Sequence, residues 1–132
     1  MKKLYFLFTL MFAFSIQSQV IITEIADPNN DSQARFIELT NIGDNAFDLT
    51  GYQLVRWTNA NTAYTTSSAV DLSEFGSLQS KGILTLANNT NFETVYGVAP
   101  TKVIGSGGPA DSNGDDNIAI LDPNGSIYDV YG

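Results

Sequence analysis

The chain of 132 residues contains no cysteine and no histidine, and it has only one tryptophan and six lysine or arginine residues. Without cysteine and histidine it has no Ser-His-Asp or Cys-His catalytic system, because both use histidine as the base. Zinc sites built from imidazole or thiolate ligands are excluded, and so are disulfides. The groups left for chemistry are mainly carboxylates, amides and hydroxyls. The length predicts one domain.

The first 18 residues have the three parts of a secretory signal peptide. Two lysines lie in residues 1–3, an almost wholly apolar stretch covers residues 4–16, and the small residue Ser18 ends a polar segment. The apolar stretch is shorter than the ~20 residues of a transmembrane helix. The alternative is an uncleaved N-terminal anchor. We expect cleavage between Ser18 and Gln19, secretion to the extracellular space or cell surface, and a mature domain of residues 19–132 with no membrane span.

The mature chain is strongly acidic. Without the two N-terminal lysines, four basic residues stand against fourteen acidic ones, which gives a net charge of −10. The four are scattered along the chain, at Arg35, Arg56, Lys81 and Lys102. Nucleic acid and anionic lipid need clustered cations, so neither is expected as a partner. A field of this sign favours divalent cations, or neutral or basic surfaces.

Short β-strands separated by turns are predicted along the mature chain, where no stretch has a helical period. Asp122-Pro-Asn-Gly125 suits a type I turn that closes a hairpin. We expect a polar loop or short edge strand at 58–69, a short helical turn at 91–96 and a flexible segment at 105–110. A chain with roughly 7–9 short strands favours an all-β sandwich or barrel. The clearest strands are 20–25, 35–42, 47–57 (with Gly51 as a possible bulge), 82–87, 117–121 and 126–131.

The order of these segments resembles the lamin tail domain, an immunoglobulin-like β-sandwich. Each segment matches a pattern of that family, and together they cover nearly the whole mature chain. Two positions differ from the pattern, since Tyr52 stands where tryptophan is usual and Ser80 where proline is common. The matching segments are Val20-Ile-Ile-Thr-Glu-Ile25, Phe36-Ile-Glu-Leu-Thr-Asn41, Asp48-Leu-Thr-Gly-Tyr-Gln-Leu54, Leu78-Gln-Ser-Lys-Gly-Ile-Leu-Thr-Leu-Ala87, Gly114–Gly125 and Asp129-Val-Tyr131.

The resemblance implies a fold but no catalytic residues, because the family has no agreed catalytic set. Its members include nuclear lamins, where the domain follows a coiled coil, and secreted bacterial proteins, where it accompanies hydrolase or adhesion modules. The expected signal peptide and the absence of heptads place this chain with the secreted group. The chromatin binding of lamins is not expected at a net charge of −10.

An acidic loop before the last hairpin is a candidate calcium site. Asp111, Asn113 and Asp115 have the spacing of the first, third and fifth ligands of a calcium loop. Against this, Asp116 stands where glycine is needed, and Asp122, in the twelfth position, already suits the turn. The favoured interpretation is a polar loop without a metal, since such motifs match often by chance.

Two glutamates form a second candidate site. Glu24 shares an expected strand face with Val20 and Ile22, and Glu38 lies on the next strand. If the faces coincide, the paired carboxylates are the minimal set for acid–base hydrolysis. The favoured interpretation is that each carboxylate accepts hydrogen bonds that stabilise the fold.

Six aromatic residues of the mature chain are candidates for a stacking surface that binds sugars or peptides. The favoured interpretation is that most fill the core, with Trp57 the one expected at the surface. They are Tyr52, Trp57, Tyr64, Tyr96, Tyr128 and Tyr131.

These observations favour a secreted, non-catalytic immunoglobulin-like module that binds a protein or cell-surface ligand in adhesion, assembly or targeting. One alternative is the accessory domain of a larger secreted hydrolase, such as a nuclease or phosphatase. Another is a calcium-dependent module or enzyme that uses the acidic loop at residues 111–117. No catalytic residue and no cofactor is expected, with calcium only as the alternative given above, and the sequence does not identify the partner or the oligomeric state.

Overall fold

The computed structural model describes residues 18–59 and 61–131, and its regular structure is mostly β-strand with little helix. The expected signal peptide lies outside the described residues except for Ser18. Within the described part no helix is long and apolar enough to cross a membrane. The fold class predicted from the sequence, an all-β sandwich, is confirmed. The described residues form ten strands, more than predicted, because several strands are only two residues long.

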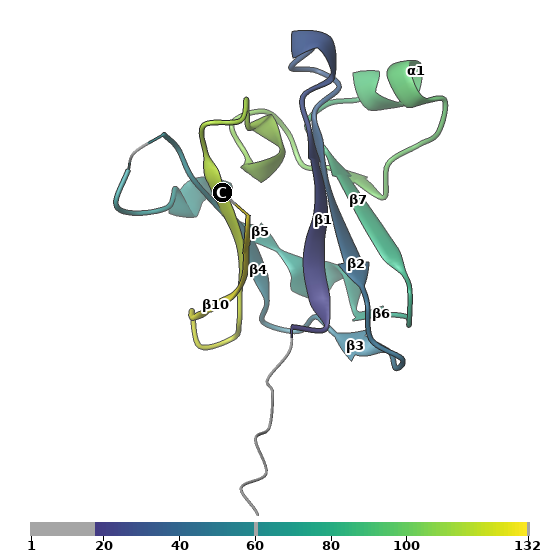
Figure 1. Cartoon of the computed structure of the whole chain (residues 1–132), viewed down its shortest axis with the longest axis vertical. Helices are drawn as coiled ribbons and strands as arrows, with labels where there is room; N and C mark the ends of the chain where they lie inside the picture. The colour runs from purple at the N-terminus through teal and green to yellow at the C-terminus, as the bar shows by residue number, and fades with distance from the viewer. Residues whose placement is uncertain (1–17, 60, 132) are drawn as a thin grey trace, which may run out of the picture.

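Two four-stranded sheets face each other (Figure 1). The first has the order β1-β2-β7-β8, in which β8 runs parallel to β7 and the other pairs are antiparallel. The second has the order β10-β9-β4-β5, all antiparallel. The strands of the first sheet are β1 (Val20–Ala26), β2 (Phe36–Asn41), β7 (Ile83–Ala87) and β8 (Lys102–Val103), and those of the second are β4 (Gln53–Trp57), β5 (Val70–Asp71), β9 (Asn117–Leu121) and β10 (Ile127–Tyr131).

Short elements cover the ends of the sandwich (Figure 1). A small sheet of β3 (Phe47–Asp48) and β6 (Ser77–Leu78) lies at the lower end in this view, and α1 (Asn91–Tyr96) lies at the upper end. The helical turn expected at 91–96 is therefore confirmed. Four 3-10 turns complete the structure: η1 (Pro28–Asn30), η2 (Thr66–Ser68), η3 (Leu72–Phe75) and η4 (Pro109–Asp111).

Alternate residues of the facing strands form the core between the sheets. Ile37 and Leu39 of β2 are fully buried, and so are Leu54 of β4 and Ile118 and Ile120 of β9. Full burial of one such side chain stabilises a protein by about 1.5–3 kcal/mol. Since successive side chains of a strand point to opposite faces, this alternation sets the register of each strand.

The strand expected at 47–57 is in fact two strands, β3 and β4, in different sheets. The side chain of Asp48 accepts hydrogen bonds from the amide and hydroxyl of Thr50, at 3.0 and 2.7 Å, which starts a turn. Gly51 then adopts a φ of +81°, and the amide of Tyr52 donates to the carbonyl of Leu49. Gly51 is therefore the corner between two sheets and not a bulge within one strand.

The hairpin at the C-terminal end is confirmed. The amide of Gly125 donates to the carbonyl of Asp122 at 2.9 Å, and Gly125 has a φ of +79°. A type I turn followed by a left-handed glycine is a common short hairpin connection. The carboxylate of Asp122 also accepts from the amides of Asn124 and Ser126. Asp122 is thus used by the turn.

The segment expected to be flexible, 105–110, is partly buried. Pro109 and Ala110 of η4 pack inside the molecule, and Gly108 is buried beside them. The carboxylates of Asp111 and Asp116, which follow this segment, pair with Arg35, next to β2, and with Arg56 of β4. This segment is therefore held by contacts that its glycine-rich composition does not predict.

Candidate functional site

The two sheets meet along two sides, and one of these is closed by hydrogen bonds between β1 and β10. The amide of Ile22 faces the open edge of β1 and donates to the Asp129 carboxylate at 2.7 Å, just before a bulge between Ile22 and Glu24. The amide of Gln19 donates to the hydroxyl of Tyr128 at 2.7 Å. Carboxylates and bulges of this kind protect the edge of a sheet from further pairing.

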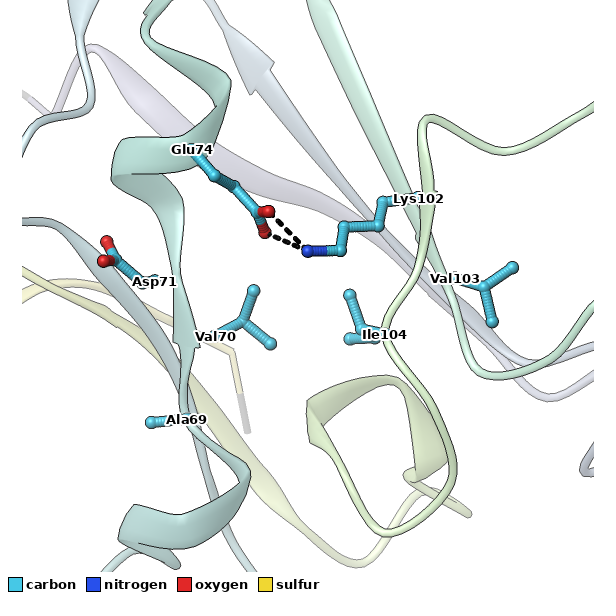
Figure 2. A pocket seen from close by; sticks show the side chains of 7 residues that line it. All are labelled: Ala69, Val70, Asp71, Glu74, Lys102, Val103 and Ile104. Carbon is cyan, nitrogen blue, oxygen red and sulfur yellow. Dashed lines mark hydrogen bonds and ion pairs between the residues drawn. The ribbon is translucent and has the colours of Figure 1, made fainter.

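The other side, between β5 and β8, contains a groove of about 430 Å³ (Figure 2). Val70 of β5 and Ile104, next to β8, point toward each other across it, and both are partly buried against the core. The residues that line the groove are Ala69, Val70, Asp71, Glu74, Lys102, Val103 and Ile104. We define these residues as the β5–β8 groove.

One ion pair bridges the β5–β8 groove (Figure 2). Lys102 Nζ donates to both carboxylate oxygens of Glu74, at 2.6 Å for Oε1. The two side chains remain 43% and 38% exposed. Ion pairs this exposed contribute only about 0–1 kcal/mol. The bridge can therefore open for a ligand at little cost in stability.

Asp71 lies at the edge of the groove, but its side chain points away from Val70 and Glu74 (Figure 2). Its carboxylate accepts a hydrogen bond from the amide of Ser73 at 2.9 Å. The pKa of Asp71 is lowered below its ordinary value of 3.8, mainly by a hydrogen bond with the side chain of Ser73 and also by the one from the Ser73 amide. Asp71 is therefore ionised at neutral pH, and Glu74 is the carboxylate that faces the groove (Figure 2).

The three residues of the calcium hypothesis have different surroundings. Asp111 is bound internally: its carboxylate accepts from Arg35 at 3.1 Å, from the Asn88 side chain at 3.0 Å and from the amide of Gly107 at 2.8 Å. Asn113 and Asp115 are exposed. Among the described residues no group of three acidic or other ligating side chains is placed to hold a metal ion. Calcium binding by this loop stays the untested alternative to a polar loop without a metal.

Two arginines hold the acidic loop to the sandwich. Arg35 pairs with both Asp111 and Asp27, which lies in the β1–β2 connection. The hydrogen bond with Asp27 is the largest of the causes that raise the pKa of Arg35. Arg56 of β4 pairs with Asp116 at 3.2 Å, and side-chain exposures of 10% and 3% show that this pair is buried. The sequence does not predict these pairings, because the paired residues lie up to 76 positions apart in the chain.

Glu24 and Glu38 lie directly opposite each other on neighbouring strands. The expectation that Glu24 shares a face with Val20 and Ile22 is wrong, because the bulge after Ile22 turns Glu24 to the outer face. Val20 and Ile22 are buried, whereas Glu24 is exposed. The carboxylate of Glu38 accepts from the Thr23 hydroxyl at 2.7 Å. Hydrogen bonding of Glu38 within the sheet agrees with a role in the fold.

The aromatic residues form separate clusters. Phe47, Tyr52 and Tyr128 pack together at the β3 end, with ring centroids 5.2 to 5.7 Å apart, and burial raises the pKa of Tyr52. Trp57 packs edge-on against Tyr64 at 5.4 Å, over the outer face of the second sheet. A single stacking surface is therefore absent among the described aromatics, and none of them lines the β5–β8 groove.

The β5–β8 groove has no recognisable pattern in the sequence. Its strands are two residues long, and Lys102, Glu74 and Val70 belong to no motif. The available signals were the short apolar pairs at 69–70 and 103–104, each next to a charged residue. These signals do not show which strands become the edges of the sheets.

The two facing sheets, closed along one side by hydrogen bonds, form an immunoglobulin-like β-sandwich module. The model of the Lamin Tail Domain family matches residues 15–132. The chain belongs to this family, as the resemblance in the sequence indicates. A search of curated proteins gave no match.

Proposed function

We propose that the chain is a secreted, non-catalytic binding module, which attaches to a protein or cell-surface ligand in adhesion, assembly or targeting. The observation that carries this proposal is the β5–β8 groove, which has apolar walls and one exposed ion pair. Shape and residue types of this kind suit binding.

Family membership and residue types support the proposal in different ways. Lamin tail domains are immunoglobulin-like modules, and the chain belongs to that family. The sequence contains no histidine or cysteine, which removes the commonest general base and the most reactive nucleophile. A binding role needs neither residue.

Expression of the full chain with a C-terminal affinity tag tests this function. We expect a product outside the cell whose N-terminus, measured by mass spectrometry, is Gln19. The labelled product should bind saturably to the surface of the producing cells, and protease treatment of those cells should abolish the binding. Retention inside the cell, or hydrolysis of phosphodiester, glycoside or ester substrates by the pure product, would contradict the proposal.

A further inference from the structure

The open edge of β8 presents main-chain hydrogen-bonding groups at the β5–β8 groove. The amide of Ile104 donates to the carbonyl of Ala87 at 2.8 Å, and β8 is parallel to β7. In this pattern Lys102 and Ile104 bond to β7, so the amide and carbonyl of Val103 point to the other edge. Since β8 is the last strand of its sheet, those two groups face the groove side.

The opposite edge of the groove repeats this arrangement. The amide of Leu72 donates to the carbonyl of Tyr52 at 2.9 Å, and Gln53 pairs with Asp71. Because bonded and non-bonded residues alternate in an antiparallel pair, the amide and carbonyl of Asp71 point away from β4. Both edges therefore offer main-chain groups to an extended chain lying between them.

The groove is large enough for side chains and is apolar where Val70 and Ile104 meet. Its volume of about 430 Å³ lies within the range of ~300–1,000 Å³ found for ligand pockets. A single aliphatic side chain of a bound peptide would cover these two residues and bring the partly buried walls closer to full burial.

Charge decides which peptide fits. Every one of the four basic residues among the described residues is in an ion pair: Arg35, Arg56, Lys81 and Lys102. These pairs engage five of the fourteen acidic residues, which leaves nine carboxylates of the described chain without an ion pair. A second copy of the chain would bring the same excess of negative charge. A basic partner is therefore favoured over self-association.

We propose that an extended peptide segment of a partner protein adds as a strand to the edge of β8, with an aliphatic side chain over Val70 and Ile104 and a lysine or arginine against Glu74. Strand addition takes affinity from main-chain hydrogen bonds and specificity from alternate side chains. The basic side chain of the peptide competes with Lys102 for Glu74. This inference deepens the binding role proposed above and rests on it.

Peptide binding to the full chain, purified as its secreted product, tests the inference. The probe is a fluorescein-labelled peptide pool with a fixed isoleucine, a lysine two residues later and random neighbours, because alternate residues of a strand share a face. The matched pool has glutamate in place of lysine. We expect the lysine pool to bind about tenfold more tightly by fluorescence polarisation, a difference of ~1.4 kcal/mol. Equal binding of the two pools would overturn the inference.

Variants of the groove separate main-chain from side-chain recognition. Val103→Pro removes the amide that faces the open edge, and proline is tolerated on edge strands. Val103→Ala keeps that amide and is the matched control. We expect the proline variant to lose peptide binding and the alanine variant to retain it. Loss in both, or in neither, would contradict strand addition at β8.

A second variant, Glu74→Gln, tests the inference even if Val103→Pro does not fold. It removes the carboxylate that selects lysine, so the two peptide pools should bind with similar affinity. A preserved preference for the lysine pool would contradict the proposed contact. If cell-surface binding by the secreted product persists while Val103→Pro and Glu74→Gln leave it unchanged, this inference fails and the binding role stands. If the unaltered protein shows no surface binding, the proposed function itself fails.

Discussion

Replacement of Asp111 by alanine should destabilise the protein much more than the same change at Asp115. The Asp111 carboxylate accepts three hydrogen bonds, one of them from Arg35, and is 24% exposed. Hydrogen bonds to charged groups contribute ~1.5–3 kcal/mol each when buried and less when partly exposed. We therefore expect Asp111→Ala to cost about 2–3 kcal/mol of unfolding free energy. For a domain of this size that lowers the melting temperature by roughly 8–12 °C.

Asp115→Ala is the matched control, because Asp115 is exposed and lies in the same acidic loop. A surface substitution of this kind changes stability by about 0.5 kcal/mol or less. Thermal unfolding of the full secreted product, followed by circular dichroism, measures both variants. Equal melting temperatures for Asp111→Ala and the unaltered protein would refute the structural role of the Arg35 contact.

The same unfolding experiment, repeated with millimolar calcium and with a chelator, tests the calcium hypothesis. A ligand present at 100 times its dissociation constant stabilises the folded state by ~2.7 kcal/mol. Because Asp111 is already bound to Arg35, Asn88 and Gly107, we expect the two melting curves to coincide. A rise with calcium that Asp115→Ala abolishes would show that the loop is a calcium site.

Three further predictions concern stability. Arg56→Met should cost about 3–5 kcal/mol in chemical denaturation, because it leaves the carboxylate of Asp116 buried without its cation; recovery of stability on adding Asp116→Asn would confirm the coupling. Gly82→Ala should cost about 1–3 kcal/mol in the same assay, since its Cβ would meet the carbonyl oxygen of Gln79 at 2.8 Å. The pKa of Asp71 is lowered in the folded state, so its stabilising effect is complete above pH 3.8 and is lost as the pH falls through the lowered value; the acid melting profile of Asp71→Asn should be flatter than that of the unaltered protein.

The long strands and the last hairpin could be predicted from the sequence because they depend on local pattern. Residues 118–121 are a short continuous apolar run that is buried on both faces of its sheet, and the structure has β9 at 117–121. The turn at 122–125 is fixed by Asp122 and Gly125, whose side chain and positive φ act within a few residues. Neither feature depends on contacts with distant parts of the chain.

Bulges and corners could not be predicted because they depend on tertiary contacts. The bulge that turns Glu24 outward lies next to the bond from Ile22 to Asp129, which is 107 residues away in the chain. Gly51 forms a corner where its amide meets the hydroxyl of Ser73 and its Cα approaches Pro123. A period of two predicts a side chain's face only where the strand is regular.

The candidate site depended still more on the three-dimensional fold. Val70 and Ile104 are ordinary apolar residues, and only the order of strands in the two sheets makes β5 and β8 neighbouring edges. The sequence predicted the sign of the charge but not that every described cation would be paired internally. The acidic field and the groove together define the expected ligand.

Amide hydrogen exchange, measured by NMR on the ¹⁵N-labelled secreted product, tests most directly whether the β5–β8 groove binds an extended basic peptide. The amide of Val103 faces the open edge of β8, as inferred from the ladder to β7, and should exchange quickly in the free protein. With the lysine-containing pool present in excess, we predict slower exchange at Val103 and shifted signals at Val70 and Glu74. Unchanged exchange at Val103, with the shifted signals on another face, would contradict the account.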